Sequence, residues 1–261
     1  MTFSTLIPKI FAQFSNIVSI LFTQSSKFKL ILPNPPQPNP LASTGLVTTK
    51  PKIKTNKIVE IRKKETINAY RELGLTEENI IRFDYPDFSL RNFIGYILSN
   101  KEYGVLPRLI KELRRIKATR LFVPNGYREH MDHEATYYIG SYDGPQVGDP
   151  VIVDLGEPFR IKSYLQYSVW GDFSPEDALV SNRPVSLRGN VVITVSKHVE
   201  EKVRQAIRKF ESQQEILKYI LTQRENRKID DRYLEIYMLY DPRPRLDYEP
   251  YKEIVAAIDK Q

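Results

Sequence analysis

The feature that most constrains the fold is a regular alternation of short apolar runs with amphipathic helical patterns. Apolar runs typical of strands occupy residues 80–83, 121–123 and 151–154, and helical patterns at 90–98 and 106–116 separate them. Strands that alternate with helices are typical of a parallel sheet with crossover helices. The sequence therefore predicts an α/β fold, a Rossmann-like and mostly parallel sheet with helices on both faces.

The same patterns predict further elements before and after this central alternation. A helix is expected over residues 58–73, ended by Gly74 in the left-handed conformation that glycine adopts easily. A long amphipathic helix is expected over 197–224, starting beside His198, which we interpret as a surface or capping residue. The remaining predicted strands are 28–32, 160–169, 190–195 and 233–239.

Composition narrows the classes of protein and of site. With 41% hydrophobic and 27% charged residues among 261, the chain is typical of a soluble globular protein, most simply one large domain or one domain with extensions. It contains no cysteine, which excludes disulfides, thiolate zinc sites and cysteine nucleophiles. This usage is compatible with an intracellular protein, and we expect a cytoplasmic one, with a membrane-peripheral location as the alternative.

Positive charge is concentrated near the N-terminus. No Asp or Glu precedes Glu60, whereas seven lysines do, and these equal the whole formal excess of +7. Residues 60–261 are therefore close to neutral, and a nucleic-acid binder would carry its excess charge on the folded domain. We expect no nucleic-acid partner.

Residues 1–26 contain Lys9 as their one charge before Lys27 and show apolar residues at helical spacing. They predict an amphipathic N-terminal extension that packs on a main domain of residues 27–261. The alternative is that residues 1–57 lie on a membrane surface, assisted by the lysines. Within the main domain, 33–57 is an altered Pro- and Lys-rich segment, since prolines at 33, 35, 36, 38 and 40 exclude helix and central strand there.

A His-x-Asp-His cluster, residues 130–133, follows the apolar run 121–123 and precedes a predicted helix start at Glu134. The carboxyl ends of strands are where open α/β sheets build their sites. Imidazole and carboxylate are ligands of catalytic zinc, and a neighbouring Asp can fix a histidine's tautomer. The alternative is a solvated helix start with Asp132 stabilised by the helix dipole.

The chain resembles the LmbE/PIG-L family of zinc-dependent N-acetylglucosaminyl deacetylases in four blocks that occur in family order. The blocks are Arg62-Lys63-Lys64-Glu65 with Ala69 and Leu73-Gly74, then Asp87, then His130-Met131-Asp132-His133, and last a late helix that ends in Ser212-Gln213. The resemblance implies that zinc is bound by His133. It also implies that His130, oriented by Asp132, stabilises the reaction intermediate, and that Arg62 and Asp87 bind hydroxyls of an N-acetyl sugar or glycoconjugate.

The chain departs from the family where the P-H-P-D-D motif normally follows the first strand. The matching place is Pro33-Asn34-Pro35-Pro36-Gln37, in which Asn34 and Gln37 replace two zinc ligands and Pro36 replaces the base. Amides are poor, neutral zinc ligands, and proline cannot transfer a proton. Only 24 residues separate Gln37 from Arg62, so the first crossover unit is expected to be shortened or replaced.

Three functions follow. The first is a deacetylase relative that has lost catalysis through these replacements, with zinc weak or absent, and that keeps a sugar-binding cleft or only the scaffold. The second is an active metal-dependent amidohydrolase with a rebuilt metal site. The third is a non-catalytic protein of a membrane surface or an interaction partner. Trp170 is most simply a core or surface aromatic, although a tryptophan near the site could stack on a sugar ring.

Overall fold

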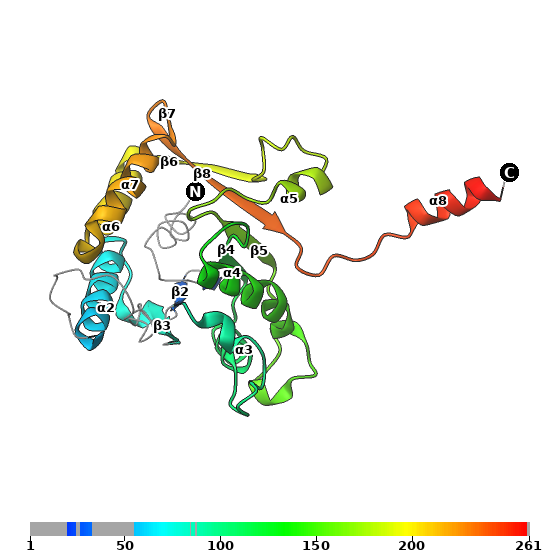
Figure 1. The fold of residues 1–261 in the computed structure, drawn as a ribbon, viewed down its shortest axis with the longest axis horizontal. Helices are drawn as coiled ribbons and strands as arrows, with labels where there is room; N and C mark the ends of the chain where they lie inside the picture. The colour runs from blue at the N-terminus through cyan, green and yellow to red at the C-terminus, as the bar shows by residue number, and fades with distance from the viewer. Residues whose placement is uncertain (1–19, 25–26, 33–54, 84, 87, 260–261) are drawn as a thin grey trace, which may run out of the picture.

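A computed structural model of the chain describes residues 20–24, 27–32, 55–83, 85–86 and 88–259 (Figure 1). The strands form one mixed sheet in the order β3-β2-β1-β4-β5-β8-β6, and β7 pairs with β8. The strands are β1 Ile20–Gln24, β2 Lys27–Leu32, β3 Ile80–Arg82, β4 Arg120–Pro124, β5 Ser163–Tyr167, β6 Val191–Ser196, β7 Lys228–Ile229 and β8 Arg232–Tyr240.

Helices lie on both faces of this sheet, as the sequence predicts, and the last helix, α8, stands away from it (Figure 1). They are α2 Thr55–Glu72, α3 Val105–Arg115, α4 Met131–Tyr138, α5 Pro175–Val180, α6 Lys197–Arg208, α7 Gln214–Glu225 and α8 Glu249–Ile258. In the part of the chain that the structure describes, no helix is long and apolar enough to cross a bilayer.

Four strands of the sheet run in the same direction, although several neighbouring strands pair antiparallel. The pairs β2–β3 and β4–β5 are parallel, and β1 is antiparallel to both β2 and β4. Strands β2, β3, β4 and β5 therefore all run one way, and β1 is inserted among them in reverse. As a result, the carboxyl ends of these four strands lie at one edge of the sheet.

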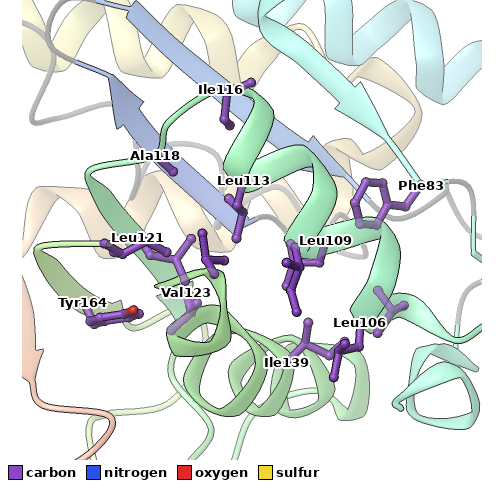
Figure 2. Packing of buried hydrophobic residues seen from close by; sticks show 14 of the residues in the cluster. Phe83, Leu106, Leu109, Leu113, Ile116, Ala118, Leu121, Val123, Ile139 and Tyr164 are labelled. Carbon is purple, nitrogen blue, oxygen red and sulfur yellow. The ribbon is translucent and has the colours of Figure 1, made fainter. Parts of the chain in front are cut away.

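Alternation along β4 produces two cores, one on each face of the sheet. Phe122 faces a cluster built from α2, α6 and α7, whereas Leu121 and Val123 face a cluster built from α3 and α4. Figure 2 shows the second cluster, where Leu109 and Leu113 of α3 lie against β4. Both leucines are fully buried, as expected for the apolar stripe of a helix on a sheet.

The six strands predicted at 28–32, 80–83, 121–123, 160–169, 190–195 and 233–239 are confirmed as β2, β3, β4, β5, β6 and β8, with shifts at their ends. The predicted helix 58–73 is confirmed as α2, and 106–116 is confirmed as α3. Gly74 has φ +78°, and the chain ends the helix there with Leu75 N donating to Tyr70 O at 3.0 Å.

The strand predicted at 151–154 is wrong. Val151 and Val153 are 86% and 70% exposed, and Val153–Leu155 is a single 3-10 turn. The buried guanidinium of Arg114 binds the carbonyls of this segment instead, donating to Asp149 O, Ile152 O and Gly156 O at 2.6 Å each. Carbonyls held by one side chain are not available to a strand ladder.

Three helix predictions also need correction. The helix expected at 90–98 is only a 3-10 helix, Leu90–Phe93, and Gly95 follows it at φ +131°. The helix expected at 197–224 is two helices, α6 and α7, separated at the fully buried Phe210. Residues 20–24, expected to be helical, form strand β1. Residues 1–19 and the proline-rich segment 33–40 lie outside the described residues, so the predictions made for them remain untested.

Candidate functional site

The candidate site begins where β4 and β5 end side by side. Asn125 N donates to Tyr167 O at 2.7 Å, which continues the ladder one residue beyond β4. The Asn125 side-chain amide then donates to Asp172 O at 2.7 Å, so it joins the loop after β4 to the loop after β5. Asn125 is buried, and these bonds fix the two loops that carry the polar residues described next.

Glu129 is the most heavily bonded side chain of the site. Its Oε1 accepts backbone N–H groups of Val169, Trp170 and Gly171 at 2.9, 2.9 and 3.1 Å. Its Oε2 lies 3.1 Å from Nδ1 of His133. The side chain is fully buried. Burial of a carboxylate is tolerated when hydrogen bonds replace its water, and three of these bonds also position the β5 loop.

His133 lies in the first turn of α4 and is 2% exposed. When its Nδ1–H donates to Glu129, the other ring nitrogen, Nε2, is left as an acceptor. A carboxylate that holds the distal N–H of a histidine is the usual support of a metal ligand. Glu129, a residue that the sequence analysis did not single out, thus fixes the position of the His133 ring.

His130 is the N-cap residue of α4, and its Nδ1 accepts Asp132 N–H at 3.2 Å. Its ring packs edge-on against Phe88 at 4.5 Å between centroids and lies 5.5 Å from the His133 ring. Burial, and then the neighbouring His133, lower the pKa of His130, which favours the neutral ring. A neutral ring that accepts at Nδ1 carries its proton on Nε2, and this buried nitrogen has no hydrogen-bond partner among the described residues.

Asp132 joins the loop after β3 to α4. Its Oδ2 accepts Phe88 N–H at 2.7 Å, and its Oδ1 accepts Leu90 N–H at 3.2 Å. The residue is 3% exposed. Both carboxylate oxygens are therefore bonded to the backbone of the β3 loop, and the contact with His130 is made by the Asp132 backbone amide. The two buried carboxylates, Glu129 and Asp132, thus tie the loops after β3, β4 and β5 together.

The two other predicted site residues are Arg62 and Asp87. Arg62 is on α2, with Nη1 3.8 Å from Glu65 Oε2. Glu65 accepts Ser212 N–H at 2.7 Å and the Ser212 hydroxyl at 2.6 Å, so the first and last blocks of the resemblance are in contact. Asp87 lies outside the described residues.

A groove of about 400 Å³ lies on the other side of the loop that Glu129 holds. We name it the Trp170 groove. Residues of the β5 loop form one wall and residues of α7 form the other, and Trp170 and Tyr219 are 42% and 59% exposed. Its polar side chains are Ser168, Asp172, Gln223, Asn226 and Arg227. Aromatic surface beside amides and hydroxyls is the combination that binds polar rings.

The described residues do not provide a zinc site of the usual kind. No group of three or more His, Cys, Asp or Glu side chains among them could hold a metal ion. His133 is one suitable donor, but the carboxylates beside it already accept backbone amides, Asp132 with both oxygens and Glu129 with one. A catalytic zinc needs three protein ligands. Among the described residues, the donors therefore do not make up the metal site that the resemblance implies.

Residues 40–141 match the PIG-L family, described as GlcNAc-PI de-N-acetylase. This segment of the chain is similar to that family. The matched segment runs from before α2 through β3, α3, β4 and α4, and it includes the His-x-Asp-His cluster. The predicted resemblance to the LmbE/PIG-L family is confirmed, and no curated protein matches the sequence.

Solved structures show the same fold for this chain. It is similar to N,N'-diacetylchitobiose deacetylase from Pyrococcus horikoshii, bound to its inhibitor MPG, with 22% identity, a TM-score of 0.54, and 75% of this chain and 68% of that one covered. It is also similar to the conserved protein TT1542 from Thermus thermophilus, with 21% identity, a TM-score of 0.52, and 72% of this chain and 75% of that one covered. A third similar structure is GalB, the 4-carboxy-2-hydroxymuconate hydratase from Pseudomonas putida, with 15% identity, a TM-score of 0.53, and 76% of this chain and 79% of that one covered.

Two of these proteins are named for different chemistries, deacetylation and hydration, on one fold. The fold alone therefore does not select the reaction of this chain, and the residues of the site must decide it.

Proposed function

We propose that this deacetylase-like protein binds an N-acetyl sugar or glycoconjugate at the Trp170 groove, beside the loop that Glu129 ties to His133, and has lost zinc-dependent hydrolysis. The observation that carries the proposal is the state of the two buried carboxylates. Asp132 accepts one backbone amide with each oxygen, and Glu129 uses Oε1 for three backbone amides and Oε2 for His133, so both carboxylates already serve as supports of the surrounding loops and of His133. Asn34, Pro36 and Gln37 occupy the sequence positions of the family's remaining ligands and base.

The polar groups that remain suit binding better than catalysis. The neutral His130 ring offers an Nε2–H donor with no acceptor among the described residues, and an acetamide or hydroxyl oxygen is a suitable acceptor. Trp170 and Tyr219 offer exposed aromatic surface on which a sugar ring can stack. Glu129 holds the Trp170 loop through three amides, so the aromatic platform is preorganised.

The active metal-dependent amidohydrolase is the second candidate, and one observation favours it. Glu129 holds His133 as a carboxylate holds the histidine of a zinc centre, with Oε2 3.1 Å from Nδ1. Arg62 and Asp87 would bind sugar hydroxyls under either function. The two functions differ in whether bound sugar loses its acetyl group.

The test uses the fluorescence of Trp170, the one tryptophan of the chain. Protein treated with a chelator is titrated with N,N'-diacetylchitobiose, with chitobiose as the matched sugar without acetyl groups. We expect the acetylated sugar alone to change Trp170 emission saturably, and Tyr219→Ala to weaken the binding about tenfold, as loss of an aromatic contact of about 1.4 kcal/mol implies. Tyr142→Ala is the control, because Tyr142 is similarly exposed but does not line the groove.

Acetate release is measured in parallel with added zinc. We expect none above buffer background from the wild type or from His130→Asn/His133→Asn. Zinc-dependent release that is lost in the double variant would establish the amidohydrolase instead. Absence of saturable binding by either sugar would refute the sugar-binding cleft.

A further inference from the structure

Helix α8 stands away from the rest of the protein at the end of the chain (Figure 1). All of its residues are exposed. Tyr251, Ile254, Val255 and Ile258 recur at the spacing of one helix face and are 56–63% exposed. A helix of ten residues is marginal by itself in water, and an unpartnered apolar stripe of this kind marks an interaction site.

The segment between β8 and α8 directs the helix away from its own domain. Residues 241–248 read Asp-Pro-Arg-Pro-Arg-Leu-Asp-Tyr, with prolines at 242 and 244. Closely spaced prolines favour the extended polyproline conformation and make a linker semi-rigid. The surface that covers the α8 stripe therefore belongs to another molecule.

A suitable surface lies where this linker begins. A groove of about 780 Å³, the β5–β8 groove, lies beside the amino end of β5 and the carboxyl end of β8, at the sheet edge opposite His130. Ile161, Tyr164 and Leu239 contribute apolar lining. Its basic residues are Arg160, Lys162, Arg243 and Arg245, and its acidic residues are Asp149, which pairs with Arg243, and Asp241.

The charges of the helix and of the groove are complementary. Helix α8 carries Glu249 and Glu253 against Lys252, and Asp259 and Lys260 follow it in the sequence. The helix is thus net acidic and the groove is net basic. Opposite potentials across an interface favour encounter and fix orientation. An acidic helix is poorly suited to the anionic surface of a membrane, which attracts basic amphipathic helices.

We propose that α8 of one copy of this chain packs in the β5–β8 groove of a second copy, and that the second copy returns the same contact. The acidic helix α8 and the basic β5–β8 groove are both present on one chain, at the two ends of the linker 241–248. A reciprocal exchange about a two-fold axis satisfies both at once and closes the assembly as a dimer. This interface is independent of the sugar cleft.

The first experiment measures the mass of the full chain in solution by light scattering. We expect twice the mass of one chain for the wild type and a twofold fall in mass for Ile258→Glu, which places a charge within the apolar stripe. Ala256→Glu is the matched control on the opposite face of α8 and should remain dimeric. A monomeric wild type would overturn the proposal, as would a dimer that persists in Ile258→Glu.

The second experiment locates the acceptor surface by cross-linking, which the cysteine-free sequence makes specific. Val255→Cys protein is mixed with Lys162→Cys protein under mild oxidation, and we expect a disulfide-linked heterodimer. Lys218→Cys, exposed on α7, replaces Lys162→Cys in the control mixture and should give none. Cross-linking in the control alone would place α8 on another surface and overturn the proposal. Flotation of a monomer with vesicles containing anionic lipid would assign α8 to a membrane and overturn it as well.

Discussion

Glu129 Oε2 lies 3.1 Å from His133 Nδ1, while its Oε1 accepts three consecutive amides of the loop after β5. One buried carboxylate therefore orients a histidine on α4 and shapes the wall that carries Trp170. The orientation of His133 and the position of the Trp170 groove are two effects of the same side chain.

Replacement of Glu129 should affect both. Glu129→Ala leaves the amides of Val169, Trp170 and Gly171 without their acceptor, and we expect a loss of at least about 2 kcal/mol in the free energy of unfolding. The emission of Trp170 should shift to the red as the loop loosens. Urea unfolding followed by fluorescence measures both. Glu157→Ala removes an exposed acid and should change stability by less than about 0.5 kcal/mol.

Protein purified without added metal should contain far less than one zinc per chain, because His133 is one suitable donor among the described residues and three are needed. Elemental analysis of the dialysed protein measures the number of zinc ions per chain. A value near one zinc per chain would contradict the prediction, and Asp87 and His130 would then be the first ligands to test by substitution.

Glu65 and Ser212 should show a measurable coupling energy. Ser212 donates both its backbone N–H and its hydroxyl to the buried Glu65 carboxylate, which joins α2 to the turn between α6 and α7. In a double-mutant cycle of Glu65→Gln and Ser212→Ala, we expect a coupling of about 1–2 kcal/mol in the free energy of unfolding. Strictly additive effects would show that the contact contributes nothing to stability.

Stability should depend on pH through Asp143. This buried carboxyl has an Oδ2 without a hydrogen-bond partner in the described part of the chain, and burial raises its pKa from 3.8 to about 7. Because the folded-state pKa lies above the unfolded value, the folded state holds the proton more tightly. The Asp143 contribution is therefore fully present below about pH 4 and is lost as the pH rises to about 7, with a size of up to about 4 kcal/mol.

Asp143→Asn removes this titration at nearly constant volume. The variant should match the wild type in stability near pH 4 and exceed it by a few kcal/mol above about pH 7. Urea unfolding of both proteins across this range isolates the difference from all other titrating groups. A difference that does not change with pH would contradict the assignment.

Deletion of residues 1–26 should abolish folding, because it removes β1. This strand pairs with β2 on one side and with β4 on the other, so its loss divides the sheet. We expect insoluble protein, or a circular dichroism spectrum without cooperative melting. A soluble, stably folded protein of residues 27–261 would show that β1 is dispensable and would favour a separate role for the N-terminal segment.

The strands that could be predicted from the sequence are those in which a run of apolar residues is buried on both faces of the sheet. Runs such as Leu121–Val123 have apolar side chains on both faces, and such strands are buried in any α/β sheet. Val151 and Val153 have the same local composition but are exposed, because Arg114, far away in sequence, binds their neighbours' carbonyls. No window of local sequence contains that information.

The histidine motif of the candidate site could be recognised in the sequence, but the residues that hold the histidines in place could not. His130, Asp132 and His133 form a compact motif, and the structure brings them together at the end of β4. Glu129 lies four residues before His133, yet its role depends on amides some 40 residues later in the chain. Trp170 and Tyr219 meet across a groove only because the β5 loop and α7 are adjacent in space.

The reversed strand β1 separates β2 from β4 at the sheet edge that carries His130. With strands spaced about 4.8 Å apart, the end of β2 is about 10 Å from the end of β4. Strand β2, the more distant of the two, ends at Leu32, and the altered motif follows it in the sequence at positions 33–37. Restoring His and Asp at positions 34, 36 and 37 would therefore place them after a strand that β1 separates from β4, and not after a strand next to the one that precedes His130 and His133.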